Sequence, residues 1–517
     1  MNKRIYKIIY LALILISFEC SKILEKVLKH RKYVCITTKY CYSRWGPYKH
    51  PIFELQPQQV PVNIYAYNHE FYGDEISNVK QSTLCWKLDT LRISLLVHDH
   101  NDLMTSDHWT FKTALANLVN YDNIFYEHYK RCVRKCYKKN EKCRKKCKNF
   151  EKFYKIYGTT FLIIDYSQIR YLSYPQAVGT IRYVSTVVFN FLKENRKCRW
   201  VHPDNKDKYV WFPYYRVYNG VGAGMGAHLI GQVAFALKKV GGSFYKITGL
   251  NPSTFLFQHG YVTEYMDETD AKFTVSLKSA QSFLEHWKIF DTPQISYAKT
   301  QLIVNRGYNQ PNCEFSFKTM LAFDRFKCDY DLAIYMYLYS INIGQWEFYE
   351  AKNYKDFIQG RVYSCYEKNC YYIDSHLQHY YSIYPVTLYT ITLKNEPYRG
   401  KIFFVEIICE NAFSFNGKID IRILHKNHHN SDLVRLNVGY KFGTIRVMKL
   451  IAVEDNGDPA SIKIISTRMV GKLKKISIIN HQLRKDQMRD KYKYEACFDQ
   501  IWLGNEETAY FGNCRNT

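Results

Sequence analysis

The sequence predicts an α/β fold with a doubly wound sheet, followed by an all-β sandwich. One observation is a strand-like run that passes through the glycine-rich turn Gly222–Gly226 into an apolar helical pattern. A second is the alternation of buried-type strands with helical patterns before that turn, which is typical of a parallel sheet covered by helices. A third is the change near Tyr380 to short alternating runs separated by turn residues, which indicates a β-sandwich.

The N-terminal sequence and the net charge indicate the compartment of the protein and the kind of partner that it binds. Three basic residues precede the apolar run Ile8–Ile16, so residues 1–20 are expected to be a secretory signal peptide. The formal net charge of +26 favours anionic partners, such as a phospholipid surface or heparin-like sulfated glycans. A secreted protein is not expected to bind nucleic acid. No later run reaches about 18 continuous apolar residues, so no transmembrane segment is expected.

Two buried-type strands are expected in the first part of the chain. Leu91–Val97 runs directly into the polar stretch His98–Asp102. Thr159–Asp165 precedes a helical pattern over Tyr171–Leu192. Strands and helices that alternate in this way build a doubly wound α/β sheet.

A basic segment over residues 128–155 lies between these two strands. Its last 26 residues carry thirteen Lys or Arg and two Glu, and its four cysteines follow a C-x3-C-x6-C-x3-C spacing. Cysteines four apart face one side of a helix, so two short helices can be joined by nested disulfides, Cys132–Cys147 and Cys136–Cys143. A zinc site is the alternative, although a secreted protein with sixteen cysteines favours disulfides.

This basic hairpin is a candidate anion-binding site. A solvated surface hairpin without a ligand is the alternative interpretation. The candidate anion-binding residues are Lys130, Arg131, Arg134, Lys135, Lys138, Lys139, Arg144, Lys145 and Lys146.

The stretch Tyr214–Leu237 is expected to form a strand, a tight glycine turn and a helix. Ile230, Val233 and Leu237 recur at helical spacing on one face. Strand, sharp turn and helix make up a nucleophile elbow, in which a serine occupies the middle of the turn. The middle residue here is Gly224, which has no side chain and cannot attack a substrate.

Three motifs resemble those of the animal pancreatic lipase family. Gly222–His228 resembles that family's Gly-His-Ser-Leu-Gly-Ala-His, and Lys246–Pro252 resembles its Ile-Thr-Gly-Leu-Asp-Pro. Cys328–Leu332 resembles its Cys-Asn-His-Leu-Arg. The resemblance implies an α/β-hydrolase fold over residues 28–378 and a C-terminal PLAT (C2-like) sandwich over 379–517. The family's Ser-Asp-His triad would then read Gly224, Asn251 and Tyr330 in this chain.

The same resemblance implies an oxyanion hole at His100 and Met225. His98-Asp99-His100 stands where the family has His-Gly-Phe, so a carboxylate replaces a glycine beside the hole. A carboxylate there would repel a developing oxyanion. The alternative is a solvated loop in which Asp99 has no special role.

A degenerate calcium site is also implied by the resemblance. Asp267 and Asp270 match two of the family's carboxylate ligands, while Val262 and Tyr265 replace the other two charged positions. Calcium needs several oxygen ligands, and Glu264 offers one more. No cofactor is otherwise expected.

Further disulfides and a lid are implied by the family pattern. Cys313 and Cys328 would close a short lid loop over residues 313–328, while Cys85, Cys198 and Cys409 stay unassigned. The remaining implied pairs are Cys35–Cys41, Cys365–Cys370 and Cys497–Cys514. The runs expected in the sandwich include Val386–Leu393, Lys401–Ile407, Lys418–Leu424 and Ile462–Ile465.

The substituted triad leaves three interpretations. The first is a secreted, catalytically inactive lipase homologue that binds lipid or anionic surfaces. The second is an active triacylglycerol lipase or phospholipase A1 with a displaced nucleophile, such as Ser253 or a serine of the lid. The third is a storage protein similar to the yolk proteins that resemble lipases. Loss of the nucleophile or the base alone typically costs on the order of 10⁶ in turnover, which favours the first.

Overall fold

A computed structural model describes the backbone of much of the chain. The described residues are 33–37, 40–43, 60–68, 71–78, 92–120, 159–172, 174–195, 199–201, 209–211, 217–254, 257, 263–280, 296–308, 310–313, 324–342, 346–360, 370–373, 385–396, 398–425, 434–453, 459–480, 493–495, 502–503 and 508–512. The expected signal peptide, the basic hairpin, most of the lid loop and the Cys497–Cys514 pair lie outside these residues.

The chain divides into two compact units. The first consists of residues 1–275 and 288–298, and the second of residues 276–287 and 299–517. The division falls within strand β11, Ala271–Lys278. No helix in the described parts of the chain is long and apolar enough to cross a membrane.

The first unit is built on a mixed, mainly parallel sheet. Its strand order is β10-β9-β5-β6-β3-β4. The strands are β3 (Asn63–Tyr67), β4 (Tyr72–Glu75), β5 (Arg92–Val97), β6 (Thr159–Asp165), β9 (Val217–Ala223) and β10 (Phe244–Leu250). β10, β9, β5 and β6 are mutually parallel, whereas β3 is antiparallel to both β6 and β4. The two expected buried strands are β5 and β6, and their interior residues are nearly all buried.

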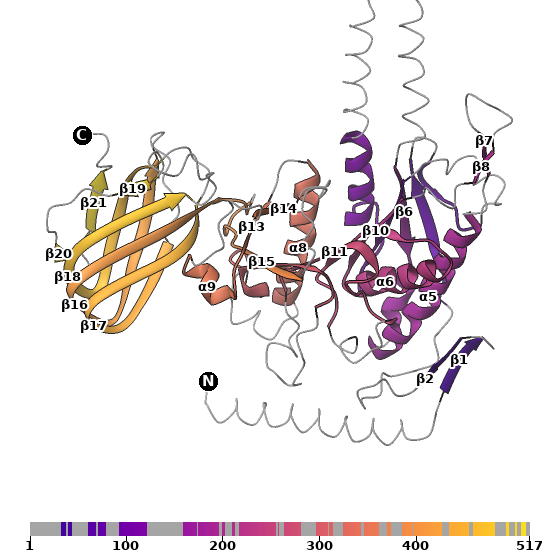
Figure 1. Cartoon of the computed structure of the whole chain (residues 1–517), viewed down its shortest axis with the longest axis horizontal. Helices are drawn as coiled ribbons and strands as arrows, with labels where there is room; N and C mark the ends of the chain where they lie inside the picture. Colours follow the sequence, from indigo (N-terminus) through magenta and orange to yellow (C-terminus); the bar gives the residue numbers. More distant parts are fainter. Residues whose placement is uncertain are drawn as a thin grey trace, which may run out of the picture. The chain divides into compact units, whose positions relative to one another are not determined.

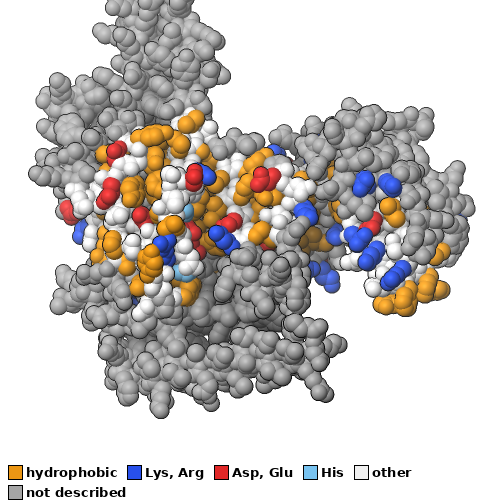
Figure 2. All heavy atoms as spheres, turned by 180° about the vertical axis from the view of Figure 1, so that it is seen from behind, with side chains coloured by type: hydrophobic (Ala, Val, Ile, Leu, Met, Phe, Trp, Pro, Cys, Tyr) orange, Lys and Arg blue, Asp and Glu red, His pale blue; other side chains and the backbone are white. Residues whose placement is uncertain are grey.

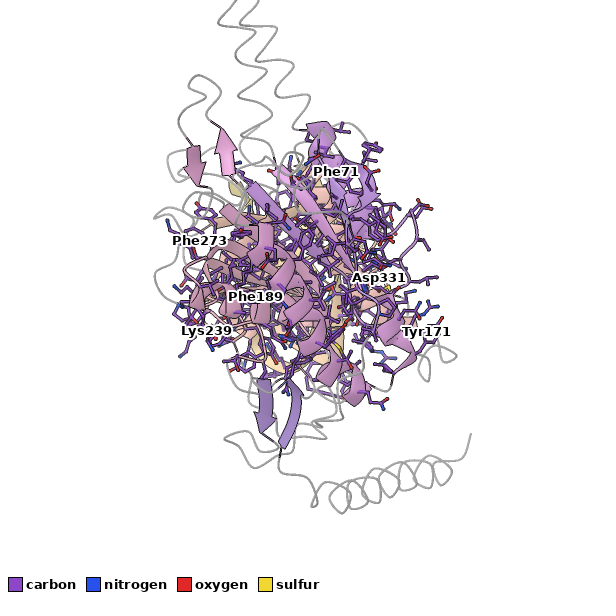
Figure 3. All side chains as sticks on the ribbon, turned by 90° about the vertical axis from the view of Figure 1, so that its right-hand side faces the viewer. Phe71, Tyr171, Phe189, Lys239, Phe273 and Asp331 are labelled. Carbon is purple, nitrogen blue, oxygen red and sulfur yellow. A yellow bond between two sulfur atoms is a disulfide. The ribbon has the colours of Figure 1, made fainter. Side chains whose placement is uncertain are left out.

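Two helices lie side by side against this sheet (Figure 1). They are α5 (Tyr174–Asn195) and α6 (Met225–Lys239), and residues 109–120 are also helical. The predicted apolar face of α6 is fully buried at Ile230, Val233 and Leu237. Figure 3 shows Phe189 of α5 among packed side chains, while Lys239 at the end of α6 lies at the edge. A short 3₁₀ helix, η1 (Ser167–Tyr171), precedes α5.

Two short hairpins accompany the first unit. β1 (Tyr33–Thr37) pairs antiparallel with β2 (Tyr40–Ser43), and this register places the backbone of Cys35 opposite Cys41. The second hairpin joins β7 (Arg199–Val201) to β8 (Tyr209–Trp211). The Cys35–Cys41 disulfide stays a prediction, since the side chains lie outside the described part.

The second unit begins with four paired strands. Their order along the sheet is β14-β13-β15-β12, and β15 runs parallel to β12. The elements are β12 (Thr300–Val304), η4 (Asn305–Gly307), α8 (Asp324–Asn342), β13 (Trp346–Glu350), α9 (Tyr354–Ile358), β14 (Cys370–Ile373) and β15 (Val386–Thr390). The run Val386–Leu393 was expected in the sandwich, and its assignment was wrong. A short alternating run does not reveal which sheet it joins, because the pairing partner is distant in sequence.

The C-terminal part is all β, as predicted, but its strands are long. The six-stranded sheet contains β16 (Lys401–His425), β17 (Val434–Val453), β18 (Pro459–Asn480), β19 (Lys493–Glu495), β20 (Trp502–Leu503) and β21 (Thr508–Gly512). The expected separate strands Lys401–Ile407 and Lys418–Leu424 are two parts of β16. Irregularities at residues 409–412 and 414–417 lie between them. A bulge inserts extra residues and lets the pairing resume, so a turn-like sequence does not end the strand.

Candidate functional site

The centre of the candidate site is the sharp turn between β9 and α6. Gly224 alone separates the strand from the helix, and its backbone has φ 52° and ψ −118°. The Gly224 N–H donates to the carbonyl of Leu250 at 3.0 Å. The Gly224 carbonyl accepts from the N–H of Ser253 at 3.3 Å, so the turn rests on the chain that follows β10. This is the strand–turn–helix geometry that the glycine pattern predicted.

The carboxylate of Asp99 lies directly over this turn. The Met225 N–H donates to Asp99 Oδ1 at 2.9 Å, and the His100 N–H donates to the same oxygen at 2.8 Å. A Cβ built on Gly224 would lie 2.2 Å from Asp99 Cγ. Such a distance is far below van der Waals contact, so the carboxylate takes up the space that a side chain at position 224 would need.

Asp99 reaches this position because parallel strands end at the same edge. Val97 of β5 pairs with Gly222 of β9, so the residues that follow the two strands meet. The Met225–Asp99 hydrogen bond therefore joins residues that are 126 positions apart.

The backbone of Asp99 is held from two further directions. Its N–H donates to Asp102 Oδ2 at 3.0 Å, and that oxygen also lies 3.2 Å from Nε2 of His108. On the other side, the Tyr166 N–H donates to His98 Nε2 at 3.1 Å. His98 Nδ1 must then carry the proton, and it donates to the Asp99 carbonyl at 2.6 Å.

Hydrogen bonds to the carboxylate of Asp99 keep this side chain ionised. Burial acts to raise the pKa of Asp99, but hydrogen bonds and charge from His100, with the N–H of Met225, outweigh it and leave the pKa below its usual value. The side chain is 14% exposed. A buried carboxylate with several donors is stable in its charged form. The interpretation of Asp99 as part of a solvated loop was therefore wrong.

This geometry changes the expected oxyanion hole. The resemblance assigns the hole to the N–H groups of His100 and Met225 and places the Asp99 carboxylate beside it. In the structure both N–H groups already donate to one carboxylate oxygen. A carboxylate oxygen of the chain itself therefore lies where the resemblance places an oxyanion.

The other two positions that the resemblance assigns to the triad lie in different units. Asn251 follows β10 in the first unit, is buried and has φ 45°. It thus lies in the chain segment that contacts Gly224 through Leu250 and Ser253. Tyr330 lies on α8 of the second unit and is half-buried.

His228, in the first turn of α6, has a structural role. The Met266 N–H donates to Nδ1 at 3.1 Å, so Nε2 carries the proton and donates to the Ser253 carbonyl at 2.6 Å. Burial lowers the pKa of His228 to about 4. A neutral, fully buried imidazole in these contacts holds the segment after β10 against the helix.

The possible calcium ligands are engaged in other contacts. The Asp267 N–H donates to Asp270 Oδ2 at 2.9 Å, and Asp267 Oδ1 accepts from the N–H of Thr269 at 2.5 Å. Burial, with a contribution from the Asp267 charge, raises the pKa of Asp270 to about 8. Glu264 forms a buried ion pair with Arg182.

Calcium prefers several ionised or carbonyl oxygens. Asp270 Oδ2 and Asp267 Oδ1 already accept backbone N–H groups, and the Glu264 carboxylate is paired with Arg182, so these residues do not fit the ion. Within the described part of the chain, no group of three or more His, Cys, Asp or Glu could hold a metal.

Two cysteine assignments lie in the described residues. A disulfide joins Cys313 and Cys328, with Cα atoms 5.8 Å apart. This is the pair expected at the base of the lid loop. Cys409 is a buried free thiol on β16, and burial raises its pKa to about 12.

Sequence reasoning singled out Gly224 and Asp99 but missed the residues that support Asp99. These are His98, Asp102, His108 and Tyr166. The available signal was a cluster of His and Asp immediately after a buried strand. Their partners depend on strand register and on a residue after β6, which the local pattern does not reveal.

Comparison with known proteins identifies related sequences. A family model described as Lipase matches residues 87–398. Lipase member H of Mus musculus is 24% identical over 309 residues, covering 56% of this chain and 64% of that protein. Lipase member H of Oryctolagus cuniculus is 25% identical over 311 residues, covering 56% and 65%. The chain therefore spans slightly less than two thirds of the length of these curated relatives.

The solved structures add little. A coral 8R-lipoxygenase, described as activated by calcium through a C2-like domain, is 18% identical and covers 22% of this chain and 17% of its own. The TM-score is 0.17, which is too low to support an argument about fold or function.

Proposed function

Because this chain belongs to the lipase family, we propose that it is a catalytically silent member that binds lipid or anionic surfaces. The proposal that the protein is catalytically silent rests on the Asp99 carboxylate over the turn at Gly224. The proposal that it binds lipid or anionic surfaces rests on the family and on the net charge of +26. The activity of the curated relatives is not transferred, because the positions that would perform the chemistry differ.

The filled anion position opposes ester hydrolysis. A tetrahedral intermediate needs two free N–H donors, and loss of one donor typically costs about 10²–10³ in turnover. Here the N–H groups of Met225 and His100 both donate to Asp99 Oδ1. A developing oxyanion would also meet a negative charge at hydrogen-bond distance, which is strongly repulsive at a site with little water.

The nucleophile and the base are absent as well. Gly224 offers no hydroxyl, and position 330 carries a tyrosine instead of a histidine. A tyrosine side chain, with an unperturbed pKa of about 10, is a poor base at neutral pH. A triad acts as a unit, and its members cannot be removed without losing most of the rate. The substitution of all three positions and the filled hole favour the same conclusion independently.

The displaced-nucleophile alternative is less well supported. Ser253 lies next to the turn, but the neighbouring imidazole of His228 contacts the Ser253 carbonyl. With a pKa of about 4, His228 is also a weak base at neutral pH. These contacts give His228 a packing role.

Secretion is part of the proposal. The expected signal peptide and the sixteen cysteines suggest an oxidising compartment, and the Cys313–Cys328 disulfide fits one. Anionic lipid or sulfated glycan would then be met outside the cell. The C-terminal all-β part is proposed to be the PLAT (C2-like) module.

A fluorophosphonate ester tests whether the protein is catalytically silent, because it forms a covalent bond only with an activated serine. We expect the purified protein to remain unlabelled while an active pancreatic-type lipase is labelled in parallel. A phosphonylated serine found by mass spectrometry in the unmodified protein would contradict the proposal and identify the displaced nucleophile.

A further inference from the structure

Two positively charged side chains lie close together in the second unit. They are Arg306, in the turn η4 after β12, and Lys449 on β17, and we call them the cation pair. Burial and the positive charge of Arg306 both lower the pKa of Lys449, which indicates that the two charges interact. Since like charges repel, two cations held together destabilise the protein unless an anion joins them.

Helix α9 connects the segments that carry the two cations. The guanidinium carbon of Arg306 lies 5.4 Å from the centre of the Tyr354 ring at the start of this helix. Leu450, which follows Lys449 on β17, is buried in one hydrophobic cluster with Phe357 of the same helix. The two cations therefore belong to segments that are distant in sequence and meet at α9.

The turn that carries Arg306 has an unusual backbone. Asn305, Arg306 and Gly307 all have positive φ, at 47°, 74° and 80°. Residues with a side chain rarely adopt this conformation, and such strain is concentrated at functional sites. The buried Asn305 side chain holds the turn, because its Nδ2 donates to Gln310 Oε1 at 2.7 Å and its Oδ1 accepts from the Thr392 N–H at 3.1 Å. The Arg306 side chain therefore leaves a fixed backbone.

The ring beside Arg306 is also fixed. Tyr354 packs against Phe357 and Tyr389, with ring centres 5.8 and 5.9 Å away. Burial raises the pKa of Tyr354 to about 12, although the charge of Arg306 opposes this, so the hydroxyl is neutral at physiological pH. A neutral ring attracts the guanidinium but does not neutralise its charge.

Neither cation has a carboxylate partner in the described part of the chain. The ion pairs that Lys and Arg form there involve neither Arg306 nor Lys449. The Lys449 ammonium donates to the carbonyl of Arg435 at 3.4 Å, which is a long bond to a neutral group. Figure 2 shows that Lys and Arg spheres predominate over Asp and Glu spheres on the C-terminal sheet, at the right of the view. The described residues of this unit therefore offer the cation pair no counter-ion.

We infer that the cation pair binds a phosphate monoester group. The guanidinium of an arginine donates to two phosphate oxygens at once, and a lysine ammonium adds a point charge. A phosphate monoester carries a charge of about −1.5 to −2 at pH 7, so it balances two cations. A sulfate ester carries a single negative charge and would leave one cation uncompensated.

Two kinds of molecule carry such a group. One is a lipid whose headgroup ends in a phosphate, and the other is a free phosphate compound. Both present the same oxygens to Arg306 and Lys449, so the phosphate defines the site. The inference rests on the proposed binding of lipid or anionic surfaces, and it names the chemical group that one site recognises.

Titration calorimetry of the full chain tests this recognition. The probes are inorganic phosphate, octyl phosphate and octyl sulfate, the last two below the concentrations at which they form micelles. We expect octyl phosphate to bind at least about tenfold more tightly than octyl sulfate, a difference of about 1.4 kcal/mol. Equal binding of inorganic phosphate and octyl phosphate would assign the site to a free phosphate compound, and a preference for octyl phosphate would assign it to a lipid headgroup. Either result supports the inference.

Two variants and a matched control locate the site. Arg306→Gly removes the guanidinium and suits the positive φ of the turn, so this variant is expected to fold. Lys449→Met removes the charge and keeps an apolar side chain of similar length. Arg468→Gly is the control, since Arg468 is also an exposed arginine with positive φ, 54°. We expect each of the first two variants to bind octyl phosphate at least about tenfold more weakly, and the control to bind it like the unmodified protein.

Thermal unfolding provides a second measurement. A ligand that binds only the folded protein stabilises it, so octyl phosphate should raise the unfolding midpoint of the unmodified protein and of Arg468→Gly. It should not raise the midpoint of Arg306→Gly. If one phosphate contacts both cations, Arg306→Gly/Lys449→Met should lose less affinity than the two single losses combined, because the contacts are coupled.

Three results would overturn the inference. If octyl phosphate binds the unmodified protein and both single variants equally well, another basic surface such as the hairpin over residues 128–155 is responsible, and the proposed function stands. If octyl sulfate binds as tightly as octyl phosphate, the cation pair does not select a phosphate. If no phosphate probe binds but the protein binds anionic vesicles or heparin, the inference is wrong and the proposed function stands, whereas the absence of all these contacts contradicts both.

Discussion

Replacing Gly224 with serine is expected to damage the fold at the elbow. A Cβ at position 224 would lie 2.2 Å from Asp99 Cγ, so the carboxylate must leave. Its departure breaks the hydrogen bonds from the N–H groups of Met225 and His100. The new side chain must also adopt the left-handed backbone of the turn, with φ 52°. The substitution that would recreate a nucleophile therefore first destroys the support of the turn.

The magnitude follows from these contributions. A hydrogen bond to a charged group contributes about 1.5–3 kcal/mol, and a side chain in a strained backbone conformation costs about 1–3 kcal/mol. Allowing for partial solvation of the released groups, we expect Gly224→Ser to lose about 4 kcal/mol of stability. For a unit of this size that corresponds to a fall of roughly 10 °C in the unfolding midpoint.

Two matched variants separate the clash from the backbone strain. Gly241 also has positive φ, 77°, but a Cβ there would meet nothing within 4 Å, so Gly241→Ala should cost only about 1–2 kcal/mol. In an Asp99→Gly background the clash is absent, so Gly224→Ser should lower the stability by about as little as Gly241→Ala does. The double-mutant cycle between positions 99 and 224 should then give a coupling energy of about 2–3 kcal/mol.

The assay is thermal unfolding of the four proteins of the cycle, together with Gly241→Ala. Hydrogen exchange of the peptide that contains Met225 gives a local measure, which is needed because the chain has two compact units. If Gly224→Ser costs no more than Gly241→Ala, or if the cycle shows no coupling, the Asp99 carboxylate does not occupy the space over Gly224.

Three further predictions concern the supporting structure. Because His228 is neutral and buried with a pKa of about 4 against about 6.5 when unfolded, its contribution is complete above pH 6.5 and is lost as the pH falls toward 4. Unfolding at several pH values should show a loss of up to about 3 kcal/mol over this range, which His228→Gln should flatten. The Cys313–Cys328 bridge closes a separation of 15 residues, so Cys313→Ser/Cys328→Ser should lose about 3 kcal/mol in denaturant titrations. Calcium should leave the unfolding midpoint unchanged, and a clear rise would mean that Asp267 and Asp270 bind it.

The elbow could be predicted from sequence because it is local. Strand composition, closely spaced glycines and helical periodicity all fall within Tyr214–Leu237, and each is determined by neighbouring residues. The substitution at Gly224 could also be predicted, because a local motif is enough to identify the position at which a serine is expected. The resemblance could likewise assign Asn251 and Tyr330 to the other two triad positions.

The contacts of the Asp99 carboxylate could not be predicted in this way. The sequence placed a carboxylate near the hole, since Asp99 replaces a glycine. Whether it lies beside the two N–H groups or accepts from them depends on the Val97–Gly222 register and on the side-chain conformation. The alternating run Val386–Leu393 shows the same limit, since only its parallel pairing with β12 reveals the sheet to which it belongs.

Hydrolysis by the purified, unmodified protein is the most direct test of catalytic silence. Emulsified triacylglycerol and phosphatidylcholine serve as substrates, with heat-treated protein as the control and Asp99→Gly/Gly224→Ser alongside. We expect no turnover above the control from either protein, because the unmodified chain has a filled anion position and neither has a histidine base at position 330. Clear turnover by the unmodified protein would contradict the proposal that the chain is catalytically silent.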